Sequence, residues 1–274
     1  MDRIAAIRAM FDTSGRGLEI GPSYNPIMPK AAGFDVEVLD HASTEEIRAK
    51  YRDEPNVDAN RIEPIDHVWD GRPLPEVVGG AGVYDYVVAS HVIEHTPDML
   101  GFLEQCGTLL KDTGRLVLAV PDKRRCFDLF RPLTSTGMVL QAHLDRRRVH
   151  SPATAFDHVA NMAALDGTGG WAEGAQGEVT LNHPLHFAKA VFDRSAGSTD
   201  YHDFHGWVFC PSSFRLIVSD LNEIGALDLR EVQFQTTPFF EFFVTLSRSG
   251  TGPGLSRIEL LRRVRAELAE FPES

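Results

Sequence analysis

The sequence lacks several features that would assign it to particular classes of protein. Its three cysteines, Cys106, Cys126 and Cys210, are odd in number and widely spaced, which predicts neither a disulfide framework nor a CxxC metal site. No apolar run approaches the length that crosses a bilayer, and the first residues have neither the charged start nor the apolar core of a secretion signal. We therefore expect a soluble, cytoplasmic protein without a membrane span.

Basic residues are scarce as well. The chain has 27 Lys and Arg against 39 Asp and Glu, a formal net charge of −12. Such a chain repels phosphate backbones and acidic membrane surfaces, so a nucleic-acid partner is not expected. A small-molecule or glycan substrate is favoured instead. With 274 residues, 43% of them hydrophobic, the chain can bury one large core or two small ones, which excludes disorder.

Short β-branched runs alternate with helical patterns over the first 120 residues. This alternation is typical of an α/β fold, a doubly wound, mostly parallel sheet with helices on both faces. The expected strands are residues 17–20, 36–39, 62–65, 84–89 and 115–120. Between the last two we expect a helix that starts with Thr96 as its cap, has Pro97 and Asp98 in its first turn, and ends before Gly114.

The second half of the chain has fewer strand patterns. Residues 229–235 and 241–247 predict an antiparallel hairpin at a sheet edge, preceded by a helix over 211–221. About 80 residues lie between the strand at 115–120 and these later elements, which is too many for a structureless loop. We therefore expect a helical insertion that acts as a lid or substrate subdomain. The predicted organisation is a core of residues 1–122 and 205–250, an insertion of 123–204, and a surface helix over 255–271 within a C-terminal segment of 251–274.

Two acidic residues end the first two expected strands. Glu19 is followed by Gly21 and Pro22, and Asp40 comes 21 residues after Glu19 with His41 next to it. Ligands of doubly wound sheets bind beyond the carboxyl ends of the strands, where an acid on the second strand accepts hydrogen bonds from ribose hydroxyls. The spacing therefore predicts a nucleoside. A pyrophosphate is disfavoured, because the glycines of a dinucleotide fingerprint are missing after Gly21.

Two longer runs identify a family. The run YDYVVASHVIEHTP at residues 84–97 and the run LLKDTGRLVLAVPD at 109–122 resemble the class I S-adenosylmethionine-dependent methyltransferases, of the methyltransferase type 11 kind. In that family the fourth strand ends in a vIEH turn, and a helix, LLKpgG and the fifth strand follow. The resemblance covers residues 15–122 and, more loosely, 205–248, and it implies a Rossmann-like fold. The chain departs from the family's E-x-G-x-G-x-G run at Pro22, Ser23 and Asn25.

The resemblance implies roles for individual residues. Glu19 and Gly21 hold the methionine end of S-adenosylmethionine, Asp40 holds the ribose hydroxyls, and Asp66 and His67 contact the adenine edge. Ser90 and His91 line the floor under the sulfonium. The full cofactor-binding set that we predict is Glu19, Gly21, Pro22, Asp40, His41, Asp66, His67, Ser90 and His91.

Histidines at the predicted reaction site bear on the chemistry. A hydroxyl acceptor needs a general base or a metal ion to lose its proton, and His91, His95 and His205 are our catalytic candidates. The sequence also resembles the metal-dependent O-methyltransferase branch, in which an E-x-x-E-H turn and a distal histidine bind a divalent cation. By that likeness the metal ligands are His91, Glu94, His95 and His205, a set that suits manganese, iron, cobalt or zinc better than magnesium.

Other interpretations remain open. Metal-free family members also carry Glu-His at this turn, so His91 or His95 can serve as a plain local histidine or as a general base. We expect O-methylation of a small molecule, sugar or glycan precursor; the alternatives are a metal-free N- or carboxyl methyltransferase and an inactive cofactor-binding partner subunit. Residues 123–150 carry seven basic and two acidic side chains. This segment is either a site for an anionic substrate or a solvated helix face.

Overall fold

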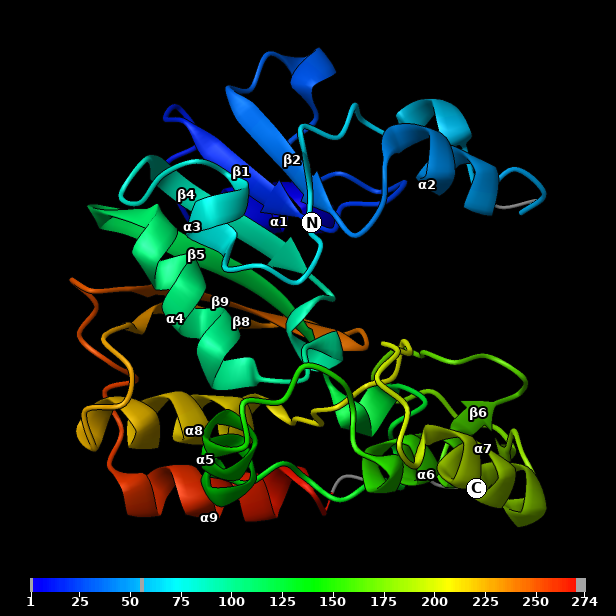
Figure 1. Cartoon of the computed structure of the whole chain (residues 1–274). Helices are drawn as coiled ribbons and strands as arrows, with labels where there is room; N and C mark the ends of the chain where they lie inside the picture. Colours follow the sequence, from blue (N-terminus) through cyan, green and yellow to red (C-terminus); the bar gives the residue numbers. More distant parts are fainter. Residues whose placement is uncertain (1, 55–56, 270–274) are drawn as a thin grey trace.

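A seven-stranded sheet forms the centre of the molecule. The computed structural model describes residues 2–54 and 57–269. The strand order is β3-β2-β1-β4-β5-β9-β8, in which the first five strands are parallel and β9 runs antiparallel to both of its neighbours (Figure 1). The strands of this sheet are β1 (Gly17–Ile20), β2 (Val36–Asp40), β3 (His67–Val68), β4 (Tyr84–Ser90), β5 (Leu110–Pro121), β8 (Arg230–Thr236) and β9 (Glu241–Ser247).

Helices cover both faces of the sheet, which confirms the expected doubly wound, Rossmann-like α/β class. The helices are α1 (Arg3–Arg8), α2 (Thr44–Lys50), α3 (Leu74–Val77), α4 (Met99–Leu109), α5 (Thr136–Leu144), α6 (Pro152–Ala160), α7 (Leu185–Ser195), α8 (Pro211–Glu223) and α9 (Arg257–Glu267). Val87 and Ala89 of β4 pack in one core cluster with α4, α5 and α8, while Tyr86 and Val88 pack in a second cluster with α1. Successive strand residues point to opposite faces, so a continuous apolar strand fills both clusters.

The second cluster depends on a glycine. A Cβ atom on Gly17 would lie 1.9 Å from Cε2 of Tyr86 on the neighbouring strand, closer than atoms can approach. We predict that Gly17→Ala lowers the free energy of unfolding by about 1–3 kcal/mol, because the buried Tyr86 ring has to shift. Urea unfolding followed by circular dichroism measures the change.

The control for Gly17→Ala is Gly137→Ala in α5, where the nearest atom to the added Cβ is Ser135 Oγ at 3.9 Å. That variant should gain about 0.5–1 kcal/mol, since alanine favours helix. Equal stability of Gly17→Ala and the unaltered protein would contradict the packing argument.

Two of the local predictions need correction. The expected strand at residues 62–65 is wrong, because Pro64 cannot donate to a ladder, and the strand is His67–Val68 instead. The cap of α4 is Asp98, which accepts from the Gly101 N–H at 2.9 Å, and not Thr96. The hairpin of β8 and β9 and the helix at 211–221 are confirmed. The tail helix is shorter than expected and ends at Glu267; Phe271 lies outside the described residues.

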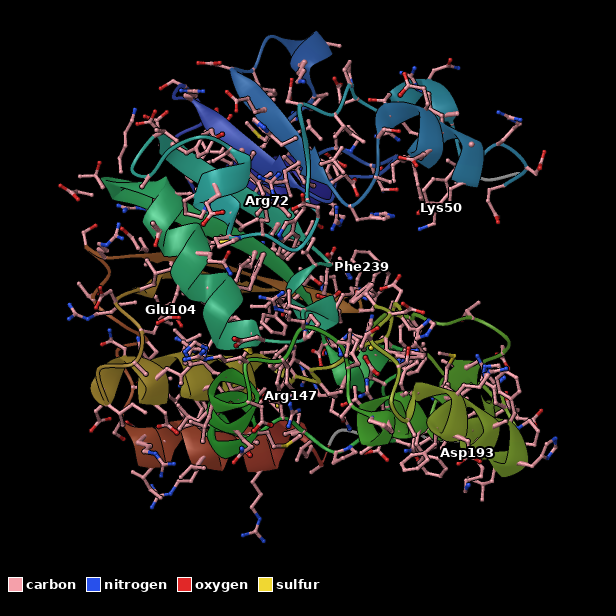
Figure 2. The ribbon with its side chains drawn as sticks, in the orientation of Figure 1. Lys50, Arg72, Glu104, Arg147, Asp193 and Phe239 are labelled. Carbon is pink, nitrogen blue, oxygen red and sulfur yellow. The ribbon has the colours of Figure 1, made fainter. Side chains whose placement is uncertain are left out.

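The long segment after β5 contains helices and strands of its own. It holds α5, which packs against α4 and α8, and the pair α6 and α7 with their own small core. A two-stranded antiparallel sheet of β6 (Ala163–Leu165) and β7 (Val179–Leu181) adjoins them. Asp193 of α7 lies on the outer side of this pair (Figure 2), where it forms an ion pair with Lys189. The expectation of helices in this segment is confirmed, with a small sheet that the sequence pattern did not predict.

The basic run after β5 is turned inward. Lys123, Arg124 and Arg125 are each less than 9% exposed. The Lys123 ammonium donates to the Leu129 carbonyl, and Arg124 pairs with Asp122. Arg125 donates to the Thr237 carbonyl and lies 3.2 Å from Glu173. These cations therefore hold the fold together and do not form a solvent-facing patch.

None of the helices among the described residues is long and apolar enough to span a membrane.

Candidate functional site

The carboxyl ends of β1, β2 and β4 meet at one edge of the sheet. Ile20 is in register with Leu39 on one side and with Ala89 on the other. The residues that follow these positions, Gly21, Asp40 and Ser90, are therefore neighbours, as expected from the sequence. In a doubly wound sheet this edge is where a ligand binds.

Glu19 organises the loop that follows β1. Its side chain is buried, and its two oxygens accept hydrogen bonds from the backbone N–H groups of Ile27 (2.6 Å) and Met28 (2.9 Å). Burial raises the pKa of Glu19 to about 7 against these two donors, which favour the ionised form. Gly21 takes a φ of 63°, which its lack of a side chain allows. Glu19 thus shapes the loop around a ligand, and a direct contact with the methionine end stays a prediction.

Asp40 offers a vacant acceptor. Its side chain is 4% exposed, and Oδ1 lies 2.7 Å from the His41 N–H and 2.6 Å from His41 Nδ1. Oδ2 is buried and accepts no hydrogen bond from any described residue. A buried acceptor of this kind costs free energy unless it is satisfied, so Asp40 fits a ligand that donates a hydroxyl group.

The pair predicted for adenine lies elsewhere. Because the third strand is His67–Val68, Asp66 precedes it and His67 lies within it. Asp66 accepts from Lys30 Nζ (2.5 Å) and from the Val38 N–H (2.7 Å), while His67 bonds to Glu37. The residues at the carboxyl end of β3 are Trp69 and Asp70, which begin a turn at Gly71 that the sequence could have revealed.

Ser90 and His91 are held by side chains from both ends of the sequence. The Arg3 guanidinium donates to Ser90 Oγ (2.7 Å) and forms a bidentate pair with Glu241 (2.7 and 2.8 Å). His91, at a φ of 54°, has Nε2 3.0 Å from Glu241 and Nδ1 3.4 Å from Glu94. Burial opposes its charge, but the two carboxylates outweigh burial and raise the pKa of His91 to about 9. Both ring nitrogens of His91 therefore face carboxylates of the protein.

His205 is far from Glu94 and His95 in the sequence, but the fold brings the three side chains together. Glu94 and His95 belong to the short 3-10 helix Ile93–His95, which follows β4, and the distal segment is tied to it by the bond from Gly206 N–H to the Glu94 carbonyl (2.6 Å). One ligand atom of each of the three side chains lies within 4.8 Å of the other two. Glu94 is fully buried, and neither carboxylate oxygen accepts a hydrogen bond from the described residues.

The charge on Glu94 is balanced by the histidines around it. Burial alone would raise the pKa of Glu94, but His91, His95 and His205 hold it below its usual value. Its Oε1 lies 3.7 Å from His95 Nε2. A buried carboxylate that is ionised, and that no donor satisfies, is suited to a cation.

A carboxylate lies close to the Nδ1 atom of each of the two candidate ligand histidines. Asp128 Oδ2 lies 2.5 Å from His205 Nδ1, and Asp203 Oδ1 lies 2.7 Å from His95 Nδ1. Asp128 bonds to His205 Nδ1 and so fixes that ring with its proton on Nδ1 and the lone pair on Nε2, as in carboxylate–histidine–metal arrangements. His95 Nδ1 is close to Asp203 but makes no hydrogen bond with any described residue. Arg131 in turn pairs with Asp128 at 2.8 Å. Burial would raise the pKa of Asp128, but His205 and Arg131 outweigh burial and lower it.

Sequence reasoning missed four side chains of this site: Arg3, Asp128, Asp203 and Glu241. A local signal existed for two of them. Asp203 lies two residues before His205, and Glu241 is the one charge in the apolar run 239–244. Arg3 and Asp128 carry no such signal, since their partners are remote in the sequence.

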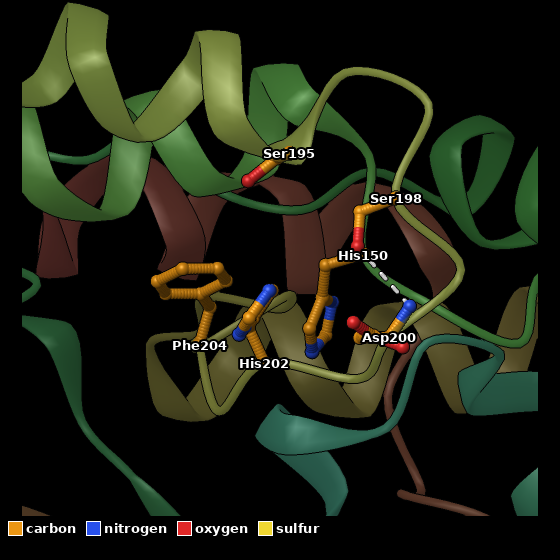
Figure 3. Close-up of a pocket in the computed structure, with 6 residues that line it drawn as sticks. All are labelled: His150, Ser195, Ser198, Asp200, His202 and Phe204. Carbon is orange, nitrogen blue, oxygen red and sulfur yellow. Dashed lines mark hydrogen bonds between the residues drawn. The ribbon is translucent and has the colours of Figure 1, made fainter.

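A small cavity lies beside the segment that leads to His205. Figure 3 shows its six lining residues, His150, Ser195, Ser198, Asp200, His202 and Phe204. Its volume of about 10 Å³ is room for one water molecule at most, so it does not take a substrate. Burial lowers the pKa of His150 to about 4, which leaves that imidazole neutral as it donates to the His95 carbonyl.

The chain was compared with known protein families and proteins. A family model described as a methyltransferase domain matches residues 1–179. No curated protein matches the chain.

Several solved structures are similar in fold. A protein from Rhodobacter sphaeroides described as a Zn-dependent alcohol dehydrogenase is 15% identical, with 91% of each chain covered and a TM-score of 0.49. The CcbJ methyltransferase from Streptomyces caelestis is 14% identical over 89% of this chain and 93% of that chain, with a TM-score of 0.46. A SAM-dependent methyltransferase from Thermotoga maritima is 10% identical over 90% and 87%, with a TM-score of 0.44. Likenesses this distant assign no activity.

The family model decides the family, whereas membership of the metal-dependent branch stays a prediction. Residues 1–179 are well over half of the chain, and they include all the strands from β1 to β5, together with Glu94 and His95. The chain therefore belongs to the methyltransferase-domain family.

Proposed function

We propose that this protein is an S-adenosylmethionine-dependent O-methyltransferase that engages its acceptor hydroxyl through a divalent metal ion. One observation carries the proposal: the buried, unsatisfied carboxylate of Glu94 lies within 4.8 Å of ligand atoms of two imidazoles, and one of these, His205, is oriented by the Asp128 carboxylate. A merely structural Glu-His turn needs neither the vacant oxygens nor the outer carboxylate.

The proposed cofactor site follows the carboxyl edge of the sheet. Asp40 Oδ2, the vacant acceptor, takes a ribose hydroxyl, and Gly21 lets the backbone approach the ligand. Pro22 and His41 flank these positions, and Ser90 and His91 line the floor. Strand β4 ends at Ser90, and the turn that holds Glu94 follows within a few residues. In this proposal the reactive methyl group therefore lies next to the metal-ligand residues.

The donor set restricts the ion. Glu94, His95 and His205 supply one oxygen and two nitrogen ligands, which suit manganese, iron, cobalt or zinc better than magnesium. A divalent ion bound there supplies Lewis acidity that lowers the pKa of a coordinated hydroxyl. Three protein ligands leave positions open, as catalytic sites require.

The residues of the chain align and hold the reactants. Methyl transfer is an in-line displacement, in which the bond from the acceptor oxygen to the methyl carbon forms as the carbon–sulfur bond breaks. Asp128 fixes the ring of His205 by its hydrogen bond to Nδ1, so the lone pair on His205 Nε2 is preorganised. His91 Nε2 bonds to Glu241, and Nδ1 lies 3.4 Å from Glu94, so the ring has no nitrogen turned toward open space. In this proposal His91, one of the catalytic candidates, lines the floor and is not a metal ligand.

The proposed acceptor is an uncharged hydroxyl compound, a small molecule, sugar or glycan precursor. Of the seven basic side chains in residues 123–150, Lys123, Arg124 and Arg125 are buried and paired within the protein. Arg131 and Arg147 pair with Asp128 and Asp145, while Arg146 and Arg148 are exposed. A neutral acceptor requires no such cations.

The proposal predicts that chelation stops methyl transfer without weakening cofactor binding. Protein dialysed against a chelator should bind S-adenosylhomocysteine in a calorimeter as the untreated protein does, because Asp40 lies outside the metal-ligand group. Its turnover of a panel of hydroxylated acceptors, read as released S-adenosylhomocysteine, should fall to background and return with Mn²⁺ or Co²⁺. Bound Co²⁺ should also show the visible absorption of a site with nitrogen and oxygen ligands.

Two results would overturn different parts of this proposal. Undiminished turnover after chelation, or no spectroscopic change with Co²⁺, would end the metal assignment. Failure of S-adenosylhomocysteine to bind would end the cofactor assignment.

A further inference from the structure

Two phenylalanines stand exposed at the carboxyl edge of the sheet, and neither belongs to the set described above. Phe239 is 54% exposed and Phe240 is 38% exposed, in the turn between β8 and β9. Figure 2 shows Phe239 at this end of the hairpin. Single exposed apolar side chains are common on protein surfaces, so exposure by itself indicates no site.

The backbone of this turn is held firmly. The Phe239 N–H donates to Thr237 Oγ1 at 3.2 Å. Three carbonyls of the turn accept bonds from the segment after β5: Thr237 from the Arg125 guanidinium (2.8 Å), Pro238 from the Glu173 N–H (2.7 Å) and Phe240 from the Asp122 N–H (2.8 Å). The two rings are thus presented on a fixed frame. These bonds account for the ordered backbone, and they leave both rings partly exposed on it.

Phe240 lies beside the candidate metal group. Its ring centroid is 5.9 Å from that of His91, edge to face, and His91 is 3.4 Å from Glu94. A Cβ atom on Gly170 would lie 3.0 Å from Cδ1 of Phe240, so the glycine backbone covers one side of the ring at close range. Phe240 as a whole keeps 38% of its surface exposed. In the function proposed above, the acceptor hydroxyl reacts close to His91 and Glu94.

Phenyl rings on a surface favour particular classes of ligand. They attract aromatic rings and the C–H faces of cyclic sugars, and they offer no hydrogen bond to an extended polar chain. We propose that Phe239 and Phe240 form the acceptor platform, and that the acceptor is an uncharged, hydroxylated six-membered ring that packs on them. This inference rests on the proposed function, because it places the acceptor at the same reaction site.

The test observes the two rings directly. Protein containing 4-fluorophenylalanine and saturated with S-adenosylhomocysteine is titrated with catechol, methyl β-D-glucopyranoside or glycerol while fluorine NMR spectra are recorded. The resonances of Phe239 and Phe240 are assigned from their loss in Phe239→Leu and Phe240→Leu. Phe187 on α7 is the matched control, since it is 40% exposed but lies outside the site, and Phe187→Leu assigns it.

We expect at least one cyclic probe to shift both site resonances and to leave that of Phe187 unchanged, whereas glycerol shifts none. A response to catechol alone identifies an aromatic acceptor, and a response to the glucoside alone identifies a sugar. Loss of one ring should weaken the binding of the responding probe about tenfold at most, and Phe239→Tyr should restore it. If neither cyclic probe shifts these resonances, or if glycerol or Phe187 responds equally, the platform is excluded.

A separate measurement distinguishes this failure from failure of the proposed function. Phe239→Leu and Phe240→Leu should bind S-adenosylhomocysteine as the unaltered protein does. Intact cofactor binding with unresponsive rings overturns the platform alone, whereas absent cofactor binding in the unaltered protein overturns the proposed function.

Discussion

Glu94→Gln should abolish stable binding of Mn²⁺ or Co²⁺ and lower methyl transfer at least about 100-fold, because even loss of an outer partner of a metal ligand costs 10- to 100-fold in metal affinity or activity. The substitution keeps the size of a fully buried side chain but removes the charge that His91, His95 and His205 surround. It also replaces one of the two unsatisfied oxygens by an NH₂ group, whose nitrogen offers a cation no lone pair. Metal content after gel filtration and released S-adenosylhomocysteine measure the two effects.

The control is Glu104→Gln on α4, because Glu104 Oε2 lies 3.7 Å from His143 Nε2, the same separation as that between Glu94 and His95. Glu104 is half-exposed and remote from the edge of the sheet, so its replacement should leave metal content and turnover unchanged. Thermal unfolding verifies that both variants fold. Full metal content in folded Glu94→Gln would show that the Glu-His turn is structural.

Asp40→Asn should weaken S-adenosylhomocysteine binding by about 10- to 100-fold, since hydrogen bonds to charged groups contribute about 1.5–3 kcal/mol. The Oδ1 contacts with His41 can be kept by the amide oxygen, but the buried Oδ2 becomes an NH₂ group that meets a ribose hydroxyl with the wrong polarity. Isothermal calorimetry gives the dissociation constant directly, without knowledge of the acceptor.

Asp12→Asn serves as the reference for Asp40→Asn. Asp12 is an exposed carboxylate that precedes β1 and bonds to Ser14, at the opposite edge of the sheet. Its replacement should not change the dissociation constant. An Asp40→Asn variant that binds as tightly as Asp12→Asn would remove the ribose assignment.

Local signals account for what was predicted correctly. The β-branched runs of β1, β2, β4 and β5 are buried on both faces, so their apolar character was visible in the sequence. Glu94 and His95 are adjacent in the chain and closely follow β4, so the sequence alone predicts that they lie at the carboxyl edge of the sheet. His205 required the likeness to a family, because nothing in its immediate sequence links it to position 94.

The errors also have physical causes. The strand at His67–Val68 is two residues long and half-exposed, so it has no apolar period that could outweigh the pattern at 62–65. The basic run at 123–125 looked like a surface feature because sequence shows charge but not burial; the partners Leu129, Asp122 and Glu173 turn it inward.

The sequence by itself determined most strands and helices of the main sheet, the edge at which its parallel strands end, and the acidic and imidazole groups available there, since strand periodicity and neighbouring residues are local properties. Only the tertiary structure decided which groups remain vacant. Asp128 reaches His205 across 77 positions and Arg3 reaches Glu241 across 238 positions, and such contacts arise from the packing of remote elements. These contacts occupy some acceptors, leave Glu94 and Asp40 Oδ2 unsatisfied, and so distinguish the groups that stabilise the fold from those free to bind a ligand.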